Sequence, residues 1–261
     1  MSSRIPLTVV IAARDEARQI GDCVRSASFA AEVLVVENDS RDETRDVAAA
    51  AGATVFSHPF STIGNQRNAA IQRALHPWIL VLDADERASS ALGDELGALI
   101  ASPPNPSVHA YRVRRRNVFL GKEIQHGGWE RDHPVRFFSR DLRYNDRAVH
   151  EHVVTSGPVG ELRERITHEP YESLAEYFEK LIRYGRGWAA QQAARGRTGS
   201  LFSVVFKPPA RFFSMLVLRA GFLDGARGVI LAALAAMSVA TKYAFLWELG
   251  RRSAPGRGDG T

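Results

Sequence analysis

The 261-residue sequence predicts an α/β fold, a mostly parallel mixed sheet with flanking helices, followed by an apolar helical extension near the C-terminus. Apolar strand patterns and helix patterns alternate over the first hundred residues, as they do in βαβ units. Further strand patterns follow without long helices between them, and the last predicted helices are unusually apolar. Together these observations predict a parallel sheet that is widened by a mixed β region.

Four strands and three helices are expected in the parallel part of the sheet. The strand patterns are nearly continuous apolar runs, such as WILVL at 78–82, which fit a sheet covered on both faces. The segments between them show the helical spacing of apolar residues. Strands are expected at 7–11, 32–37, 53–56 and 78–82, and helices at 15–27, 42–51 and 65–75.

The pattern changes after the loop SPPNPS at 102–107. Strand patterns then follow one another directly, so a mixed β region is expected beside the parallel strands. A long helix is predicted over 174–194, ending near Gly196. The additional strands are expected at 108–113, 134–138, 149–154 and 163–168.

The apolar extension has helix candidates at 211–222 and 229–249. Pro208 and Pro209 are expected to break a helical stretch, because proline has no N–H to donate. Residues 229–241 carry no charge, but this run is shorter than the ~20 apolar residues that span a bilayer. An interfacial or re-entrant membrane placement is therefore expected, with a buried helical hairpin or a homodimer interface as the alternatives.

Three parts are expected along the chain: an α/β domain over 1–198, the helical extension over 199–250 and a disordered tail over 251–261. Residues 195–261 hold ten Lys or Arg and three Asp or Glu, a net +7, so residues 1–194 carry −2 of the total of +5. A basic and apolar C-terminal part favours an anionic membrane surface over nucleic acid as the partner.

The single cysteine, Cys23, excludes a disulfide within the chain and fits a reducing compartment. The N-terminal segment MSSRIPLTVVIAARDE lacks the apolar core and cleavage site of a signal peptide. The α/β domain is therefore expected to be cytoplasmic and peripheral at the inner face of the cell membrane.

Asp83 and Asp85 follow directly after the apolar run WILVL. This places two carboxylates at the carboxyl end of a central strand, where ligands bind in open α/β sheets. Carboxylate oxygens suit Mg²⁺ or Mn²⁺, which bridge the phosphate oxygens of a nucleoside diphosphate leaving group. Taken alone, the motif fits equally well a solvated loop or a helix N-cap near Ser89 or Ser90.

Polar residues also follow the other predicted parallel strands. The first strand leads into AARDE at 12–16, the second ends in ENDSRD at 37–42, and GNQRN at 64–68 lies after the third. Because the carboxyl ends of parallel strands meet at one edge of a sheet, these segments are expected to converge with Asp83. They offer carboxylates and amides for a base and a ribose, and an arginine for phosphate.

At this point the sequence resembles the family-2 glycosyltransferases, which have the Rossmann-like GT-A fold. Glu16 matches the family's first strand-end element, where Asp15 replaces the usual Asn, and Ser40 and Asp42 match the second. Further motifs resemble the subgroup of bacterial lipopolysaccharide core β-1,4-glucosyltransferases, and the likeness covers roughly residues 6–249. These motifs are GNQRN at 64–68, LDADE at 82–86, HGGW at 126–129, NDRAVHE at 145–151 and GFLDG at 221–225.

The resemblance implies a metal-dependent, inverting transfer of sugar from a UDP-sugar to a cell-envelope glycan or glycolipid such as lipopolysaccharide core. It implies a general base at Asp132, with Glu151 as the runner-up; Asp132 pairing with Arg136 or another arginine is the alternative. Mg²⁺ or Mn²⁺ would be held by Asp83 and Asp85, with His150 or His168 completing the site. The implied nucleotide-sugar-binding residues are Ala12, Arg14, Glu16, Glu37, Asn38, Asn65, Arg67, Asp83, Ala84 and Trp129.

Two other functions are compatible with parts of the pattern. A nucleotidyltransferase shares the α/β plan, but the segment AARDEAR after the first strand lacks its glycine-rich phosphate loop. A non-catalytic, membrane-associated module could bind nucleotide sugars through the same residues. The run RVRRR at 112–116 fits contact with a pyrophosphate or phosphorylated acceptor, and equally a charged, exposed strand edge.

Overall fold

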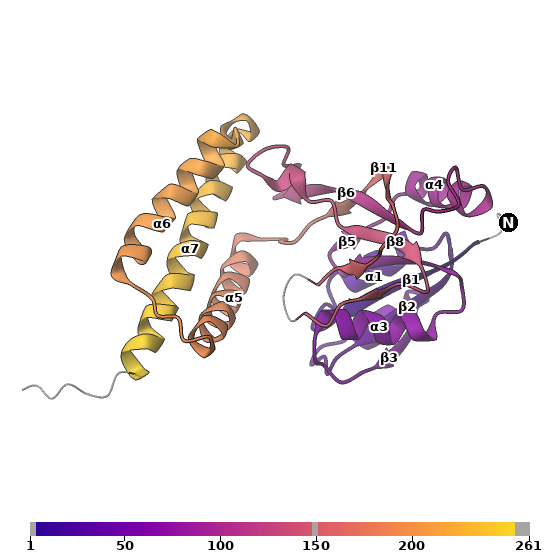
Figure 1. Cartoon of the computed structure of the whole chain (residues 1–261), viewed down its shortest axis with the longest axis horizontal. Coiled ribbons are helices and arrows are strands. Elements are labelled where there is room, and N and C mark those ends of the chain that lie inside the picture. The colour runs from indigo at the N-terminus through magenta and orange to yellow at the C-terminus, as the bar shows by residue number, and fades with distance from the viewer. Residues whose placement is uncertain (1–3, 148–150, 254–261) are drawn as a thin grey trace, which may run out of the picture. The chain divides into compact units, whose positions relative to one another are not determined.

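The computed structural model describes residues 4–147 and 151–253 and divides into two compact units (Figure 1). The first unit comprises Met1–Arg116 and Arg131–Pro170, and the second comprises Asn117–Glu130 and Tyr171–Thr261. This division differs from the domain boundary expected at residue 198. The second unit takes the long helix after residue 173, which packs against the C-terminal helices, and also a loop from the middle of the sheet region.

The first unit is built on a mixed sheet with the strand order β3-β2-β1-β4-β8-β6-β11-β5. Strands β1 to β4 pair in parallel, whereas β8 pairs antiparallel with β4 and with β6. The predicted parallel sheet with added mixed strands is confirmed. The strands are β1 Ile5–Ala13, β2 Ala30–Glu37, β3 Thr54–Ser57, β4 Trp78–Asp83, β5 Glu86–Arg87, β6 Ala110–Phe119, β8 Val135–Ser139 and β11 Val159–His168.

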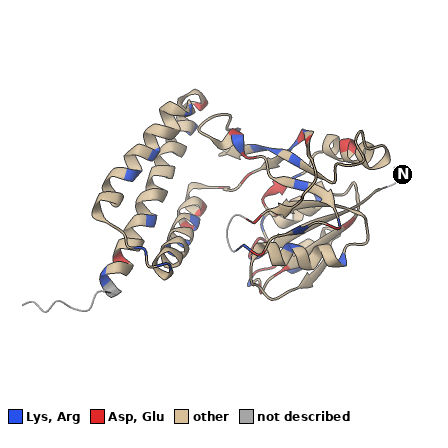
Figure 2. Cartoon of the chain, in the orientation of Figure 1, with Lys and Arg blue, Asp and Glu red and all other residues tan. Residues whose placement is uncertain are grey.

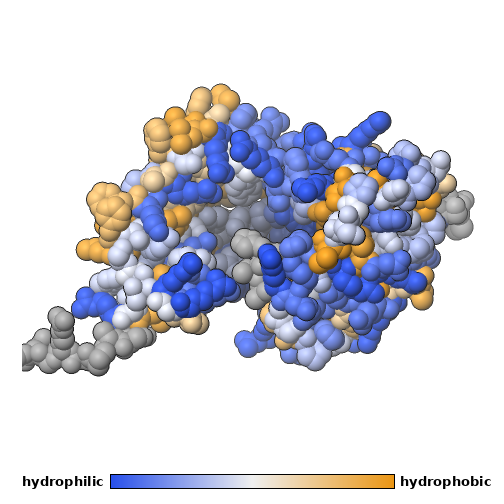
Figure 3. All heavy atoms as spheres, in the orientation of Figure 1, coloured by the Kyte–Doolittle hydropathy of each residue, from blue (hydrophilic) through white to orange (hydrophobic). Residues whose placement is uncertain are grey.

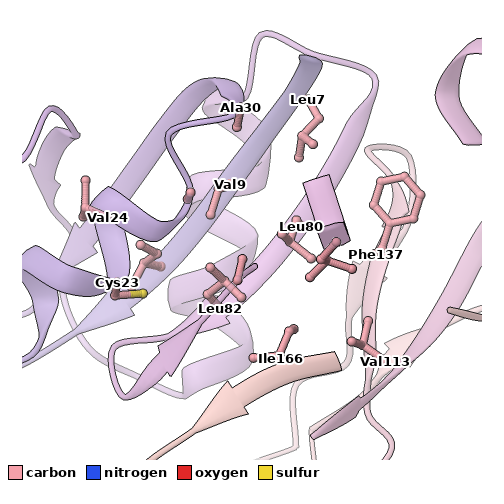
Figure 4. Packing of buried hydrophobic residues seen from close by; sticks show 14 of the residues in the cluster. Leu7, Val9, Cys23, Val24, Ala30, Leu80, Leu82, Val113, Phe137 and Ile166 are labelled. Atoms are coloured by element: carbon pink, nitrogen blue, oxygen red, sulfur yellow. The ribbon is translucent and has the colours of Figure 1, made fainter. Parts of the chain in front are cut away.

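Helices cover both faces of the parallel strands, as the continuous apolar strand patterns predict. One face packs against α1 (Ile20–Ser26), α2 (Thr44–Ala50) and α4 (Ser90–Ala101) through a cluster that includes Cys23, Leu80 and Leu82 (Figure 4). The other face packs Val10, Val36 and Val81 against α3 (Ile63–Arg73). Burial on both sides makes these strands a rigid base for the loops at their carboxyl ends.

Helices α3 and α4 begin where the sequence supplies capping side chains. The Thr62 side chain accepts a hydrogen bond from the Asn65 N–H at the start of α3, and Ser89 does the same for the Leu92 N–H of α4. Each such cap satisfies one of the free N–H groups of the first helical turn. Ser89 is therefore the N-cap that the sequence offered as the simpler reading of the region after Asp85.

Two short strands lie beside α3, outside the main sheet. Strand β9 (Arg143–Tyr144) pairs antiparallel with β10 (Val153–Val154), so the strand expected over 149–154 is shorter in the structure. Residues 148–150, including His150, lie outside the described part of the chain. Gly64 approaches this hairpin so closely that a Cβ atom there would lie 2.6 Å from the Asn145 carbonyl oxygen.

The second unit is a helical assembly of α5 (Leu174–Ala194), α6 (Leu201–Phe213) and α7 (Ala226–Ser253). The π-helical turn η2 (Ser214–Leu218) and the 3-10 turn η3 (Gly221–Asp224) connect α6 to α7. The bounds predicted for α5 are confirmed. Helix α7 runs to Ser253, into the segment expected to be disordered from 251, and residues 254–261 are not described.

The helix break expected at Pro208 and Pro209 is wrong. Both prolines lie inside α6, which is helical from Leu201 to Phe213. The two prolines remove two backbone donors, but α6 packs along α7 over its length, and this tertiary packing holds the helix together. Two described segments, Leu201–Leu218 and Ala226–Arg251, are long and apolar enough to cross a membrane by length and composition.

Candidate active site

The register of the parallel strands brings three strand ends together at one edge of the sheet. Ala12 of β1 lies opposite Asp83 of β4, and Ala13 lies opposite Glu37 of β2. The polar segments that follow these strands therefore start from neighbouring positions. The expected convergence follows directly from the pairing of β4, β1 and β2.

The loops after β1 and β2 are tied to each other by side chains. Asp42 accepts a hydrogen bond from the Ala17 N–H at 3.1 Å, and the Glu16 N–H donates to Thr44 Oγ1 at 2.7 Å. In the other direction, the Arg41 N–H donates to Asp15 Oδ1 at 2.7 Å. Asp15 and Asp39 both adopt a positive φ, which short polar side chains tolerate in turns. The two loops thus form one joined surface.

Glu37 is a buried carboxylate at the end of β2. Its oxygens accept hydrogen bonds from the Ser57 hydroxyl, from the Ser40 N–H at 3.2 Å and from Arg45 at 3.4 Å. Burial opposes ionisation of Glu37, but these donors outweigh it and hold the pKa of the carboxyl below its usual value. Glu37 is therefore an ionised, fixed acceptor next to the buried Asn38.

Asp83 is surrounded by three arginines from three different elements. Arg67 of α3 donates to Asp83 Oδ1 at 2.5 Å, Arg115 of β6 donates to Oδ2 at 2.8 Å, and Arg136 of β8 also contacts Oδ2. Burial would raise the pKa of Asp83, but the charges of Arg136, Arg67 and Arg115 outweigh burial and hold that pKa far below its usual range. Both oxygens of Asp83 are therefore occupied by guanidinium donors.

Glu86 is the fully buried counterpart of Asp83 within the same arginine cluster. Its Oε1 accepts from Arg115 Nε at 2.5 Å and from Arg136 at 3.3 Å, while Oε2 accepts from the Asp83 N–H at 2.8 Å. Burial would lower the pKa of Arg136, yet the charges of Asp83 and Glu86 raise it well above the usual value. The cluster is thus a fixed ionic network beneath the strand end.

Asp85 differs from Asp83 in its surroundings. Its Oδ2 lies 3.5 Å from Nε2 of His168, at the end of β11, and each side chain is about a fifth exposed or less, at 22% and 16%. Its Oδ1 is buried and accepts no hydrogen bond from any residue that the structure describes. A carboxylate oxygen and an imidazole nitrogen held at this separation are suitable donors for Mg²⁺ or Mn²⁺.

Asp85 and His168 are a pair and not a complete cage. Among residues 4–147 and 151–253, no three His, Cys, Asp or Glu side chains come together as a metal-ligand group. A cation at this position would need further oxygen ligands, which phosphate groups and water supply in many Mg²⁺ sites. Of the two histidines expected as the third ligand, His168 is placed beside Asp85, and His150 lies outside the described residues.

The two candidate bases are each paired with an arginine of the cluster. Asp132 Oδ2 accepts from Arg115 Nη1 at 2.6 Å, and Glu151 Oε1 accepts from Arg67 Nη1 at 3.0 Å. The Asp132 side chain is 44% exposed and the Glu151 side chain 24% exposed. Asp132 therefore pairs with Arg115, whereas Arg136 belongs to Asp83 and Glu86.

Helix α3 places its polar residues in different directions. Arg67 points into the arginine cluster with its guanidinium 5.0 Å from the centre of the Tyr144 ring. Asn68 exchanges two hydrogen bonds with the backbone of Tyr144, at 2.9 Å each, so it fixes the β9 strand. Asn65, predicted to bind the nucleotide sugar, donates to the Ser61 hydroxyl at the start of the helix.

The remaining predicted residues fall into two groups. Arg14 lies on the joined loops with its Nε 3.7 Å from Asp15, and the Ala84 carbonyl accepts from Arg87 at 2.8 Å. Trp129 belongs to the second unit, where its ring lies 6.4 Å from that of Phe119 in an edge-on contact. Trp129 is partly buried and packs against the apolar cluster of its own unit, and its predicted role in binding the nucleotide sugar stays a prediction.

Sequence reasoning missed the residues that hold Asp83 in place. Arg115 and Glu86 lie in quoted motifs without a role as partners of Asp83, and Arg136 was considered only as a partner of Asp132, whereas it pairs with Asp83 and Glu86. A signal was available in the run RVRRR, because alternation along β6 points Val113 and Arg115 inward and leaves Arg112 and Arg114 exposed. The run is therefore neither wholly a phosphate site nor wholly a charged edge.

Comparisons with known proteins place the chain among sugar-transferring enzymes. The model of "Glycosyl transferase family 2" matches residues 8–153. The lipopolysaccharide core biosynthesis glycosyltransferase LpsC of Rhizobium meliloti is 26% identical over 94% of this chain and 95% of its own length. An uncharacterised glycosyltransferase of Rickettsia typhi is 24% identical over 94% of this chain and 88% of its own.

Solved structures show more distant likeness. Glucosyl-3-phosphoglycerate synthase from Mycobacterium tuberculosis, solved with Mn²⁺, uridine diphosphate and phosphoglyceric acid, is 19% identical. That match covers 44% of this chain and 44% of that chain, with a TM-score of 0.38. A second mycobacterial structure matches 54% of each chain at 18% identity and a TM-score of 0.40, so the chain spans about half the length of these solved proteins.

Proposed function

The chain belongs to glycosyl transferase family 2, and from that premise we propose that it is a metal-dependent, inverting enzyme that uses a UDP-sugar. The acceptor is a glycan or glycolipid of the cell envelope, with lipopolysaccharide core as the leading candidate. The observation that carries the proposal is the Asp85–His168 pair at the strand edge, beside joined loops that present fixed polar acceptors.

Asp85 and His168 would hold the Mg²⁺ or Mn²⁺ ion. The buried Oδ1 of Asp85, without a hydrogen bond from the described residues, supports this assignment, since such an atom is destabilising unless something binds it. When bound, the ion would neutralise the diphosphate charge that develops as the sugar leaves. Asp83 is assigned instead to ordering Arg67, Arg115 and Arg136, because these arginines already occupy both of its oxygens.

The nucleoside is assigned to the surface that the loops after β1 and β2 form. Glu37 is ionised and fixed, and Asn38 beside it is buried, so both present defined hydrogen-bonding groups to a pyrimidine or a ribose. Arg14 and Glu16 lie on the same joined loops. Arg67, from the neighbouring α3, reaches the strand end through its contact with Asp83.

Asp132 is assigned as the base that takes the proton from the acceptor hydroxyl. Arg115 holds the Asp132 carboxylate at 2.6 Å and contacts Asp83 at the same time, so the base is fixed relative to the strand end that carries Asp85. Glu151 is less exposed and is paired with Arg67, which suits a structural role. Deprotonation of the acceptor would allow attack on the anomeric carbon opposite the nucleotide, with inversion.

The acceptor class rests on the relative that matches nearly the whole chain and on the C-terminal composition. The LpsC protein is named for lipopolysaccharide core biosynthesis, and the match extends through the apolar helices of the second unit. A basic, apolar C-terminal part suits an enzyme that works on lipid-anchored acceptors at the inner face of the cell membrane.

Hydrolysis of UDP-sugars and sugar transfer test the proposal, with Asp85→Asn as the central variant and the exposed Asp46→Asn of α2 as its matched control. We expect Asp85→Asn to lose Mn²⁺-stimulated turnover by about a hundredfold or more, and the control to retain it. Unchanged turnover in Asp85→Asn would show that Asp85 does not hold a catalytic metal ion. If the wild type turned over none of the UDP-sugars, the proposal that its donor is a UDP-sugar would be wrong.

A further inference from the structure

An exposed apolar stripe runs along α6 and the turns that follow it. Phe202, Phe206, Phe213 and Val217 are spaced by four and seven residues, so they share one face of the helix. These four side chains are 45–66% exposed, and Leu218, Phe222 and Leu223 beyond them are 53–72% exposed. Figure 3 shows hydrophobic atoms gathered on this part of the molecule. The opposite face of α6 packs on α7.

The surroundings of this stripe are cationic. Between Leu201 and Ile230 the sequence has four basic residues, Lys207, Arg211, Arg219 and Arg227, and one acidic residue, Asp224. Lys207 and Arg211 lie one turn apart on the flank of α6 that is turned away from the stripe, where Lys207 Nζ donates to the Tyr243 hydroxyl of α7 at 2.6 Å. The blue segments of Figure 2 show the same excess on α6 and α7. A basic segment with an exposed apolar face is complementary to an anionic lipid surface.

We propose that the stripe on α6, η2 and η3 docks in the plane of an anionic bilayer, and that Asp224 fixes the loop 117–130 to this docking surface. This inference rests on the proposed function in one respect, since an enzyme docked on the bilayer would meet an acceptor that is anchored in lipid. A second copy of the chain is a poorer occupant, since a two-fold contact would bring two segments of the same basic charge together.

In-plane docking fits the helices better than spanning. The segment Leu201–Leu218 would be about 27 Å long, at the lower limit for the ~30 Å hydrocarbon core, and it carries Lys207 and Arg211 near its middle. Helix α7 is long enough to span, but α5 lies against it, with the Trp188 and Tyr243 rings 5.2 Å apart. A spanning α7 would draw the exposed Arg183 and Arg186 of α5 into hydrocarbon.

The link to the loop is made by buried hydrogen bonds within the second unit. Asp224 is 6% exposed and accepts from the N–H groups of Gln125 and His126, at 3.2 and 2.9 Å. The Gly127 N–H donates to the Arg219 carbonyl at 2.9 Å. The HGGW and GFLDG motifs are thus joined to each other by these hydrogen bonds. Loop 117–130 continues along the chain into Asp132, the proposed base, so docking would also order the segment that leads to the base.

Vesicle flotation tests the docking surface without any catalytic readout. Wild-type protein is expected to bind phosphatidylcholine vesicles that contain phosphatidylglycerol, and to bind phosphatidylcholine alone much more weakly. Phe222→Ser/Leu223→Ser and Phe202→Ser/Phe206→Ser should each weaken binding by about tenfold or more, because the apolar burial is lost. Leu75→Ser is the matched control, since Leu75 is 76% exposed in the first unit, and it should bind like the wild type.

Three outcomes would overturn the docking proposal. One is wild-type protein that does not float with anionic vesicles. Another is binding that resists high salt and alkaline carbonate, since interfacial binding between cations and lipid is screened by salt, whereas a spanning helix is retained. The third is a lipid-free dimer, seen by analytical ultracentrifugation, that the stripe variants abolish while vesicle binding persists.

Asp224→Asn and Asp85→Asn separate this inference from the proposed function. Asp85→Asn should lose turnover and still bind anionic vesicles, so failure of the proposed chemistry leaves the docking test intact. Anionic vesicles are expected to stimulate transfer by the wild type, because docking would order the segment that leads to Asp132. Asp224→Asn should still bind vesicles, which reports a folded hairpin, and should lose this stimulation. Full stimulation in Asp224→Asn, or loss of its vesicle binding, would contradict the role assigned to Asp224.

Discussion

At the scale of single residues, the arginines beneath the strand edge decide what each carboxylate can do. Arg67, Arg115 and Arg136 are matched by Asp83, Glu86, Asp132 and Glu151, so the cluster is nearly neutral although it is buried. Asp85 lies beside this network, and its Oδ2 faces His168 at 3.5 Å. The two aspartates of one short motif are thereby given different chemistry by their surroundings.

Removing one charge from this network should destabilise the fold. Arg136 is 4% exposed, so Arg136→Met leaves Asp83 and Glu86 without one of their partners. We expect a loss of about 3–5 kcal/mol in the free energy of unfolding, measured by urea denaturation. Arg112→Met, at an exposed position of β6, should change it by less than about 0.5 kcal/mol. Equal effects of the two substitutions would contradict the description of the network.

Replacing the proposed base should affect turnover and leave donor binding intact. Asp132→Asn is expected to lower kcat by about a hundredfold or more, with little change in the KM for the UDP-sugar, because the acceptor proton then has no base. Glu151→Gln is the comparison, since Glu151 is the rival candidate and is paired with Arg67. A larger fall in kcat for Glu151→Gln would transfer the assignment to that residue.

The sequence located this site but could not assign its ionic partners. Asp83 and Asp85 were placed at a sheet edge because WILVL is a clear buried strand, and the structure has β4 there. The arginines come from α3, β6 and β8, which are far apart along the chain. The run at 112–116 offers four arginines, and only the pairing of β6 with β8 determines that Arg115 meets Asp132 and Asp83.

At the scale of elements, the joined loops after β1 and β2 are held by local hydrogen bonds and not by apolar packing. Asp42 accepts from the backbone of Ala17 and from Thr44. Burial opposes its ionisation, but these donors outweigh burial and lower the pKa of Asp42. The stabilising effect of an acid with a depressed pKa is present above its unfolded-state pKa and is lost as the pH falls through the folded-state pKa.

Asp42→Ala should therefore destabilise the protein at neutral pH and much less in acid. Because Asp42 is exposed and solvent screens its interactions, we expect a loss of only about 0.5 kcal/mol in the free energy of unfolding at about pH 7. The gap between variant and wild type should narrow as the pH falls below about 4. Urea unfolding of both proteins across this range measures the effect. A gap that stays constant down to the lowest pH would show that the Asp42 carboxylate is not the group involved.

The close contact of α3 with the β9 hairpin can be tested by adding a methyl group at Gly64. Gly64→Ala would place a Cβ atom 2.6 Å from the Asn145 carbonyl oxygen, so the helix or the hairpin must shift. We expect a loss of about 1–3 kcal/mol in stability. Gly187→Ala is the control, because nothing lies within 4 Å of its Cβ position in α5, and it should be neutral or slightly stabilising in the same unfolding assay.

Element patterns were predictable where apolar periodicity was strong. The bounds of α5 and the central strands follow from the sequence, whereas α6 does not, because two prolines predict a break there. The contacts of α6 with α7 decide that outcome, and they join residues that are far apart along the chain, such as Lys207 and Tyr243. Local propensity cannot represent such packing.

At the scale of the whole molecule, the chain combines a catalytic α/β unit with a basic, apolar helical unit that takes one loop from the sheet region. The family match covers residues 8–153, and the match to LpsC covers nearly the whole length, so both units recur in a relative. The sequence showed that the first part of the chain has the composition of an α/β domain and that the last part is basic and apolar. It did not reveal that residues 117–130 belong with the helices, because the hydrogen bonds of Asp224 join segments about a hundred positions apart.

The central claim is that Asp85 and His168 hold a divalent cation through which a UDP-sugar is bound, and isothermal titration calorimetry tests it most directly. UDP-sugars titrated into the wild type should bind with Mn²⁺ present and about tenfold or more weakly with a chelator. Asp85→Asn should lose this metal dependence, while Asp46→Asn keeps it. Binding of the same strength with and without metal, or full metal dependence in Asp85→Asn, would contradict the account.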